Sequence, residues 1–352
     1  MKRLIICCDG TWNSLQRPSQ ASRSNVAEIA RAIPPQDKDG IPQVVFYDDG
    51  VGTGYLAIDR LLGGAIGLGI DENILEAYRF LCMNYCPGDE IYMFGFSRGS
   101  YTIRSLGGLI SRVGLLRQDQ LKHTWEAYKL YRRKQPDCMA EPEAYYAFKE
   151  EVGKFKANHS IQNQVNIKLL CCWDTVGSLG IPTIPPLMPL RWLLEVIFDR
   201  KYSFHDTTLS SAIDHAIHAI ALHENRRVFD LTPMELPVGS RTSLSQCWFA
   251  GNHGCCGGGT RELSSINFVW VVEEMQKLGL LLELNPAVIT ENRQQQDISY
   301  NFNSFGQQIT NFAFSVFNWP PFLPHKRKNP DGAVYHPTAS ALNRTLSQVI
   351  AD

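Results

Sequence analysis

The chain has 352 residues, 44% of them hydrophobic, so it can bury a large core within one elaborated domain. Its 34 basic and 35 acidic side chains leave a formal net charge of -1. This balance excludes a global electrostatic field for nucleic acid or an anionic membrane, and we expect no nucleic-acid partner.

Six of the ten cysteines occur as adjacent pairs: Cys7-Cys8, Cys171-Cys172 and Cys255-Cys256. Adjacent residues of a strand point to opposite faces, so we interpret these pairs as small apolar fillers of a protein kept in a reducing compartment. No CxxC or HExxH spacing supports a zinc site. We expect a cytoplasmic protein without a metal or cofactor.

The N-terminal "MKRLIICCDGTW" superficially resembles a secretory signal, but its apolar run ends at Asp9 and no cleavage pattern follows. We predict a first core strand instead, and export without a cleavable signal stays open. No uncharged stretch is long enough to span a bilayer.

The first elements predict an α/β fold. The apolar runs "RLIICCDG" and "PQVVFYDDG" are typical of buried parallel strands, and "NVAEIARAI" between them has helical spacing. A second helix has apolar residues at 74, 77, 78 and 81 and stops at Pro87-Gly88. We therefore expect a mostly parallel sheet with helices on both faces.

The remaining elements extend this sheet within a single domain, 1–352. We predict strands in "EIYMFGF", "VNIKLLCCWD" and "SQCWFAGNHG", and helices in "GSYTIRSLGGLISRVGLL", "DHAIHAIALHENRRVF" and "INFVWVVEEMQKLGL". Insertions are expected near 118–160, as surface helices, and near 181–210, a proline-rich apolar stretch that could be either core or lid. An irregular C-terminal segment, 285–352, is expected to wrap the domain.

Residues 95–99 read G-F-S-R-G and fit the G-x-S-x-G elbow, in which two glycines permit a tight turn that exposes the serine oxygen. The pentapeptide alone is common. Its place between an apolar strand and a helix favours Ser97 as a nucleophile over a structural serine.

A serine hydroxyl needs a histidine base and an acid, in the chain order Ser, acid, His for an α/β-hydrolase. Asp174 follows a strand and could serve as the acid, or could only cap a turn. His253, in a glycine-rich loop, is the favoured base, although core packing is its ordinary alternative. His336 is the second choice, and burial on the predicted helix explains His215, His218 and His223 more simply.

Backbone amides of Arg98, Gly10 and Thr11 are the candidates for an oxyanion hole. Asp9 could orient the Gly10 loop, or bind a cation together with Asp48 or Asp49, but a carboxylate at a strand end is usually a cap. The glycine-rich "DDGVGTG" and "GGAIGLG" lack the spacing of a nucleotide-binding loop.

Five stretches, "CCDGTWN", "FYDDGVGTG", "GFSRGSYTIRSL", "CWDTVGSLG" and "CWFAGNHGCCGGG", together resemble the DUF2235 family of α/β-hydrolases. That family includes the catalytic region of Tle1-class phospholipase effectors of type VI secretion. The resemblance implies an α/β-hydrolase fold, ester hydrolysis and Ser97, Asp174 and His253 as the triad. It also implies an immunity or chaperone partner if the protein is a secreted effector.

Two positions depart from the family pattern: Cys255 stands where many members have Asp, and His223 precedes Glu224 where the family often has Asp. The "HAIALHENRRVF" stretch otherwise resembles the family's arginine-containing helix.

The sequence thus predicts a serine carboxylester hydrolase, lipolytic by resemblance, that needs no cofactor and could contact a membrane peripherally. The apolar stretches 181–205 and "FAFSVFNWPPFLP" could line an acyl pocket, although segments packed in the core would have the same apolar composition. A small soluble ester hydrolase and a catalytically silent binding protein of the same fold are the alternatives.

Overall fold

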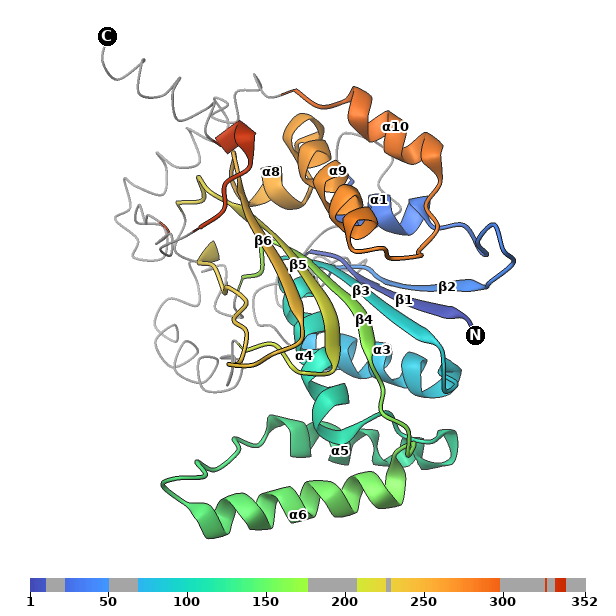
Figure 1. Ribbon diagram of the computed structural model, residues 1–352, viewed down its shortest axis with the longest axis vertical. Helices are drawn as coiled ribbons and strands as arrows, with labels where there is room; N and C mark the ends of the chain where they lie inside the picture. Colours follow the sequence, from blue (N-terminus) through green and yellow to red (C-terminus); the bar gives the residue numbers. More distant parts are fainter. Residues whose placement is uncertain are drawn as a thin grey trace, which may run out of the picture.

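The computed structural model describes residues 1–10, 23–50, 69–176, 208–225, 229–297, 327 and 333–339. Within these ranges a six-stranded parallel sheet has the order β2-β1-β3-β4-β5-β6 (Figure 1). The strands are β1 (Arg3–Cys8), β2 (Gln43–Asp48), β3 (Glu90–Phe96), β4 (Ile167–Trp173), β5 (Ile213–Ala221) and β6 (Ser243–Phe249). The predicted α/β class is confirmed.

Helices cover both faces of the sheet, and each face has its own hydrophobic cluster (Figure 1). One face carries α3 (Ile70–Asn84), α4 (Arg98–Val113), α5 (Thr124–Arg132) and α6 (Pro142–His159), with a 3-10 helix at Gln118–His123 before α5. The other carries α1 (Asn25–Ala32), α8 (His253–Gly257), α9 (Arg261–Lys277) and α10 (Pro286–Gln294). None of the helices in these described ranges has both the length and the apolar character needed to cross a bilayer.

Strand β1 shows why the sequences of the central strands are predominantly apolar. Leu4, Ile6 and Cys8 pack into one cluster, and Ile5 and Cys7 into the other, so neither face is left for polar side chains. The neighbours Cys171 and Cys172 likewise divide between the two clusters. Filling by cysteine is confirmed for both strand pairs.

The third cysteine pair belongs to a different element. Cys255 and Cys256 lie in α8, not in a strand, and both pack into the same cluster. All ten cysteines are free thiols.

The prediction of a helix over "DHAIHAIALHENRRVF" is wrong, because Ile213–Ala221 forms β5. Its apolar residues happen to recur at helical intervals, but the strand is central and buried along most of its length, so it shows no alternation. His215 and His218 are therefore strand residues, and their rings hydrogen-bond to Ser243 and Gln246 of the neighbouring β6.

The expectation of irregular structure from residue 285 onward is also wrong in part, since Pro286–Gln294 forms α10. Asn285 caps this helix by accepting the amide of Ala287, and proline occupies its first turn. Both are ordinary start signals.

Residues 333–339 return to the edge of the sheet beside β6. The Trp248 amide donates to the Val334 carbonyl at 2.9 Å, and the Trp248 carbonyl accepts from the His336 amide at 2.9 Å. Residues 333–339 are thereby tied to the strand that precedes His253. Most of the predicted 181–210 insertion lies outside the described residues.

The first turn of α4 packs directly on the ends of the strands. A Cβ at Gly95 would lie 2.7 Å from the Gly99 carbonyl oxygen, and a Cβ at Gly99 would lie 2.0 Å from the Cys8 carbonyl oxygen. Both neighbours are backbone atoms, which cannot move aside as a flexible side chain could. The two glycines of the elbow are therefore required by close approach between backbones.

We expect Gly99→Ala to lower the free energy of unfolding by about 3 kcal/mol or more, because the new methyl group would force α4 away from β1. Urea denaturation measures this loss. Gly153→Ala is the matched control: nothing lies within 4 Å of its Cβ position in α6, so the better helix propensity of alanine should stabilise the protein by about 0.5–1 kcal/mol. Equal effects of the two substitutions would contradict the packing argument.

Candidate active site

Ser97 lies between β3 and α4 with backbone angles φ 58° and ψ -121°, a conformation that non-glycine residues rarely adopt. The turn is held by neighbouring groups. The Ser97 amide donates to the Trp173 carbonyl at 3.0 Å. The Ser100 hydroxyl is within bonding distance of the Gly95 carbonyl, at 2.8 Å, and of the Trp173 carbonyl, at 3.1 Å. The strained turn is thus fixed between two adjacent strands.

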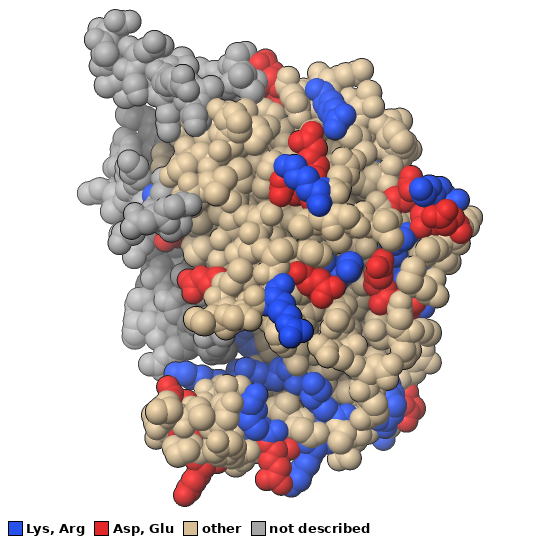
Figure 2. Space-filling model, in the orientation of Figure 1, with Lys and Arg blue, Asp and Glu red and all other residues tan. Residues whose placement is uncertain are grey.

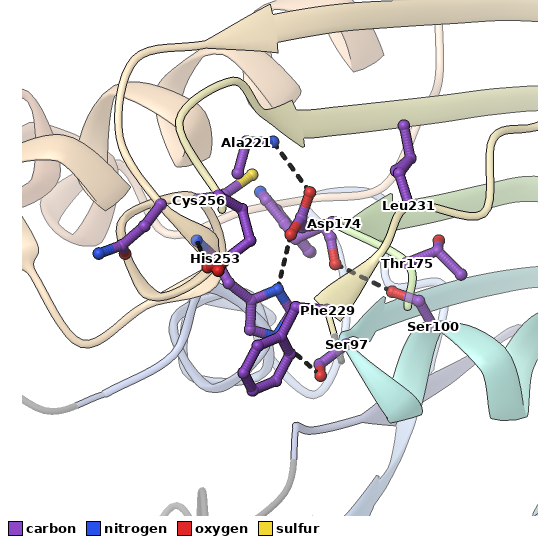
Figure 3. Close-up of polar contacts among 12 residues, drawn as sticks. Ser97, Ser100, Asp174, Thr175, Ala221, Phe229, Leu231, His253 and Cys256 are labelled. Atoms are coloured by element: carbon purple, nitrogen blue, oxygen red, sulfur yellow. Dashed lines mark hydrogen bonds and ion pairs between the residues drawn. The ribbon is translucent and has the colours of Figure 1, made fainter. Parts of the chain in front are cut away.

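His253 lies beside Ser97, although the two residues are 156 positions apart in the sequence (Figure 3). Its Nε2 is 2.8 Å from Ser97 Oγ, and its Nδ1 is 2.6 Å from Asp174 Oδ2. A neutral imidazole with its proton on Nδ1 would donate to Asp174 and accept the Ser97 hydroxyl proton at Nε2. The structure brings together the three residues that the sequence singled out.

Two aromatic rings hold the imidazole in place. The ring centroids of Phe96 and Phe229 each lie 4.7 Å from that of His253, and the Phe229 ring is stacked on it (Figure 3). Phe96 is the second residue of the elbow, so the turn that presents Ser97 also orients the base. No pattern in the sequence indicated Phe229, because its role arises only where its ring meets that of His253 in the fold.

Hydrogen bonds hold the segment before α8, which begins at His253, against the residues that follow β5. The Gly251 amide donates to His223 Nδ1 at 3.0 Å, and the His253 amide donates to Glu224 Oε2 at 3.1 Å. The Asn252 side chain caps α8 by accepting the Cys255 amide at 3.1 Å. His223, which departs from the family pattern, and Glu224, which matches it, therefore both hold the segment before His253.

Asp174 follows β4 with a positive φ of 42° and is completely buried. Its Oδ1 accepts from the Ala221 amide at 2.9 Å and from Arg327 Nη1 at 2.6 Å, and its Oδ2 accepts from Arg327 Nη2 at 2.9 Å. Burial alone would raise the pKa of Asp174, but the charge of Arg327 and the contact with His253 outweigh burial and hold this pKa well below its usual range. The carboxylate is ionised at neutral pH.

Sequence reasoning missed Arg327. It lies 153 residues from its carboxylate partner, in a stretch that reads "HKRKNP", where basic residues usually indicate a solvated surface. Only 4% of its surface is exposed.

A buried network supports the residue after Asp174. The Thr175 amide donates to His218 Nε2 at 3.2 Å, and His218 Nδ1 lies 3.0 Å from Gln246 Oε1. Burial lowers the pKa of His218 to about 3, so the ring stays neutral and can accept the amide proton. Neighbouring strands thus fix the turn that aims Asp174.

Asp9 follows β1 and is held by three donors; its role in orienting the loop stays a prediction, because residues 11–22 lie outside the described ranges. Its carboxylate accepts the Gly10 amide at 2.6 Å and the hydroxyls of Ser24 and Tyr47, each at 2.5 Å. The Gly10 amide is therefore engaged with the Asp9 carboxylate. Thr11, the other predicted donor of this loop, lies outside the described residues.

Asp48 and Asp49 are the residues that the sequence offered as partners of Asp9 for a cation. Asp48 accepts a hydrogen bond from the Asn73 side chain, and burial raises the pKa of Asp48 to about 7. Asp49 follows the end of β2. Across the described ranges, no three His, Cys, Asp or Glu side chains are arranged to hold a metal ion.

His336, the second choice for the base, occupies another position. Its Nδ1 is 3.0 Å from Thr338 Oγ1, and its ring stacks on Phe249 with centroids 4.7 Å apart. The imidazole that contacts Ser97 is that of His253.

Burial raises the pKa of Asp9 to about 6, although the three donors oppose this shift. The folded state binds this proton more tightly than the unfolded chain does. The contribution to stability is therefore fully present below about pH 4 and is lost as the pH rises through about 6.

We expect the stability of the wild type, relative to Asp9→Asn, to fall by about 2–3 kcal/mol between pH 4 and pH 7. Urea denaturation of both proteins across this range measures the difference. Asp48, whose pKa is also raised by burial, is present in both proteins, so its contribution cancels. A difference that stays constant, or grows with pH, would contradict the assignment.

Comparisons with known proteins agree with the resemblance drawn from the motifs. The family described as "T6SS, Phospholipase effector Tle1-like, catalytic domain" matches residues 2–274. Uncharacterized protein YEL023C of Saccharomyces cerevisiae is 29% identical over 262 residues, which are 70% of this chain and 35% of the yeast protein. The chain thus spans about a third of the length of this curated relative.

Solved structures with similarity to the chain were also found. An uncharacterized protein from Pseudomonas aeruginosa has a TM-score of 0.46 and 15% identity, covering 90% of this chain and 50% of its own. The Tle1 effector bound to the VgrG spike of the Type 6 secretion system has a TM-score of 0.36 and 18% identity, covering 73% and 51%. On the family match over most of its length, the chain belongs to the Tle1-like phospholipase effector catalytic domain family.

Proposed function

We propose that the chain is a serine carboxylester hydrolase that acts on lipid esters through an acyl-enzyme. The observation that carries the proposal is the continuous set of hydrogen bonds from Ser97 through His253 to Asp174, at a strained strand-to-helix turn. Family membership supports the lipid class, since the family is described by phospholipase effectors.

In this mechanism His253 Nε2 takes the Ser97 hydroxyl proton as Ser97 Oγ bonds to the ester carbonyl carbon. The positive charge that forms on the imidazole is stabilised by Asp174. His253 then gives the proton to the departing alcohol oxygen, which leaves an acyl group on Ser97. Water repeats the sequence, with His253 again as base, and releases the carboxylic acid.

The oxyanion would be stabilised at the start of α4. The Arg98 amide belongs to the first residue of this helix, where the helix dipole favours negative charge. Because the Gly10 amide bonds to Asp9, a second donor from this loop would come from Thr11.

Covalent labelling tests the nucleophile and its base. A fluorophosphonate should modify Ser97 of the wild type, and both His253→Ala and Ser97→Ala should reduce labelling and ester turnover by at least about a thousandfold. Intact-mass measurement and peptide mapping identify the labelled residue. His336→Ala is the matched control and should react like the wild type.

Two results would reject the mechanism: a folded Ser97→Ala protein with full esterase turnover, or loss of labelling in His336→Ala but not in His253→Ala. A folded wild type that neither reacts nor turns over esters of any chain length would favour the silent binding protein.

We also propose peripheral contact with a lipid surface through α5 and α6. Large hydrophobic side chains are exposed there: Trp125 by 50%, Tyr146 by 66% and, between the helices, Met139 by 92%. Figure 2 shows Lys and Arg side chains, with Asp and Glu among them, along the lower part of the molecule, which Figure 1 identifies as this region. Aromatic and basic side chains together are typical of interfacial binding.

We expect Trp125→Ala combined with Tyr146→Ala to weaken binding to phosphatidylglycerol vesicles by about tenfold, because two apolar groups no longer enter the interface. Vesicle co-sedimentation measures binding, and turnover of a soluble ester should stay within about twofold because the site is intact. Leu281→Ala, which removes a side chain that is 67% exposed after α9, is the control. An equal loss in this control would argue against a specific docking face.

A further inference from the structure

We propose that Arg327 is a positioning residue for the hydrolytic reaction, which fixes the plane of the Asp174 carboxylate so that Oδ2 faces His253. The proposal rests on the function proposed above. Arg327 lies beyond residue 274, where the family match ends, so part of the active site is supplied by a segment outside the matched region.

The contacts of the carboxylate leave it one orientation. Oδ1 accepts from Arg327 Nη1 and the Ala221 amide, and Oδ2 accepts from Arg327 Nη2 and His253 Nδ1. Each oxygen thus has two donors, which is the usual capacity of a carboxylate oxygen. Rotation about the Cβ–Cγ bond would break the paired Arg327 contacts.

The guanidinium also donates to two backbone carbonyls beside the site. Nη1 donates to the Ala221 carbonyl at 2.8 Å, and Nη2 donates to the Phe229 carbonyl. Ala221 ends β5, and the Phe229 ring stacks on the His253 imidazole. One side chain therefore connects the acid with the backbone of the residue that packs against the base.

The charges make Arg327 necessary to this arrangement. Asp174 is completely buried and Arg327 is 4% exposed, so either charge alone would be strongly penalised. Without the guanidinium, the carboxylate would either take up a proton or rotate toward another donor. Both changes would weaken its contact with the imidazolium that forms during proton transfer.

The next described residues after Arg327 are anchored at the edge of the sheet. Residues 333–339 bond along β6 through Val334 and His336, only a few residues beyond Arg327. The same strand leads into the His253 loop. The anchor and the guanidinium thus act on adjoining parts of the site.

The test uses the full chain with Arg327→Ala, Arg327→Lys and, as matched control, Arg293→Ala, which removes an exposed pair with Glu273. With p-nitrophenyl butyrate, Arg327→Ala should lower kcat about a hundredfold and leave KM within about twofold, because Arg327 acts through Asp174. Arg327→Lys should retain an intermediate kcat. Millimolar methylguanidinium should restore at least about a tenth of the wild-type kcat to Arg327→Ala and leave the other proteins unchanged.

A second readout does not depend on turnover. The His253 Nδ1 proton, bonded to Asp174 at 2.6 Å, should give a low-field proton NMR signal that His253→Asn removes. We expect this signal to be lost in Arg327→Ala and to return with methylguanidinium. The signal reports on Arg327 even if the wild type hydrolyses no ester. Failure of the proposed function can therefore be distinguished from failure of the inference about Arg327. If Arg327→Ala does not fold, Arg327→Lys serves as the test. We expect this variant to have a weaker low-field signal and a lower kcat than the wild type.

Arg327 variants that fold and keep both kcat and the low-field signal would overturn the proposal. So would a loss confined to KM, which would place Arg327 in substrate binding. A kcat loss that methylguanidinium does not reverse, with the NMR signal intact, would also overturn it.

Discussion

The buried carboxylate of Asp174 is the interaction on which the geometry of the site depends. It joins four separate parts of the chain: the end of β4, the end of β5 through Ala221, the loop of His253 and Arg327. A buried anion is stable only when it is paired and fully hydrogen-bonded, so none of these partners can be lost without cost to the others. The same interaction therefore maintains local stability and orients the proposed base.

Two strained residues stand at the ends of neighbouring strands, Ser97 after β3 and Asp174 after β4. Positive φ at a non-glycine residue persists only where the surroundings leave no alternative. Around Ser97 the constraint comes from close backbone packing at Gly95 and Gly99. Around Asp174 it comes from the neutral His218, which accepts the amide of Thr175. Packing on one strand and polar contacts on the other thus set the two positions relative to each other.

The sequence predicted what depends on local pattern. Five of the six strands, the elbow and the residues Ser97, Asp174 and His253 could be identified because apolar runs and turn motifs are continuous in the chain. β5 was misread because His215 and His218 interrupt its apolar run, and the remaining apolar residues recur at helical intervals. Arg327 and Phe229 could not be predicted, since their roles arise only when distant segments meet.

The positions that depart from the family pattern bear on the loop and not on the reacting atoms. Cys255 is buried within α8, and its amide, not its thiol, bonds to Asn252. His223 accepts the Gly251 amide, while Glu224 accepts the amide of His253 itself. An aspartate at 223 could accept the same Gly251 amide through its shorter side chain. Histidine in this place therefore changes the length of the side chain but keeps a hydrogen-bond acceptor for that amide. The hydrogen bonds of His253 to Ser97 and Asp174 are therefore compatible with both departures.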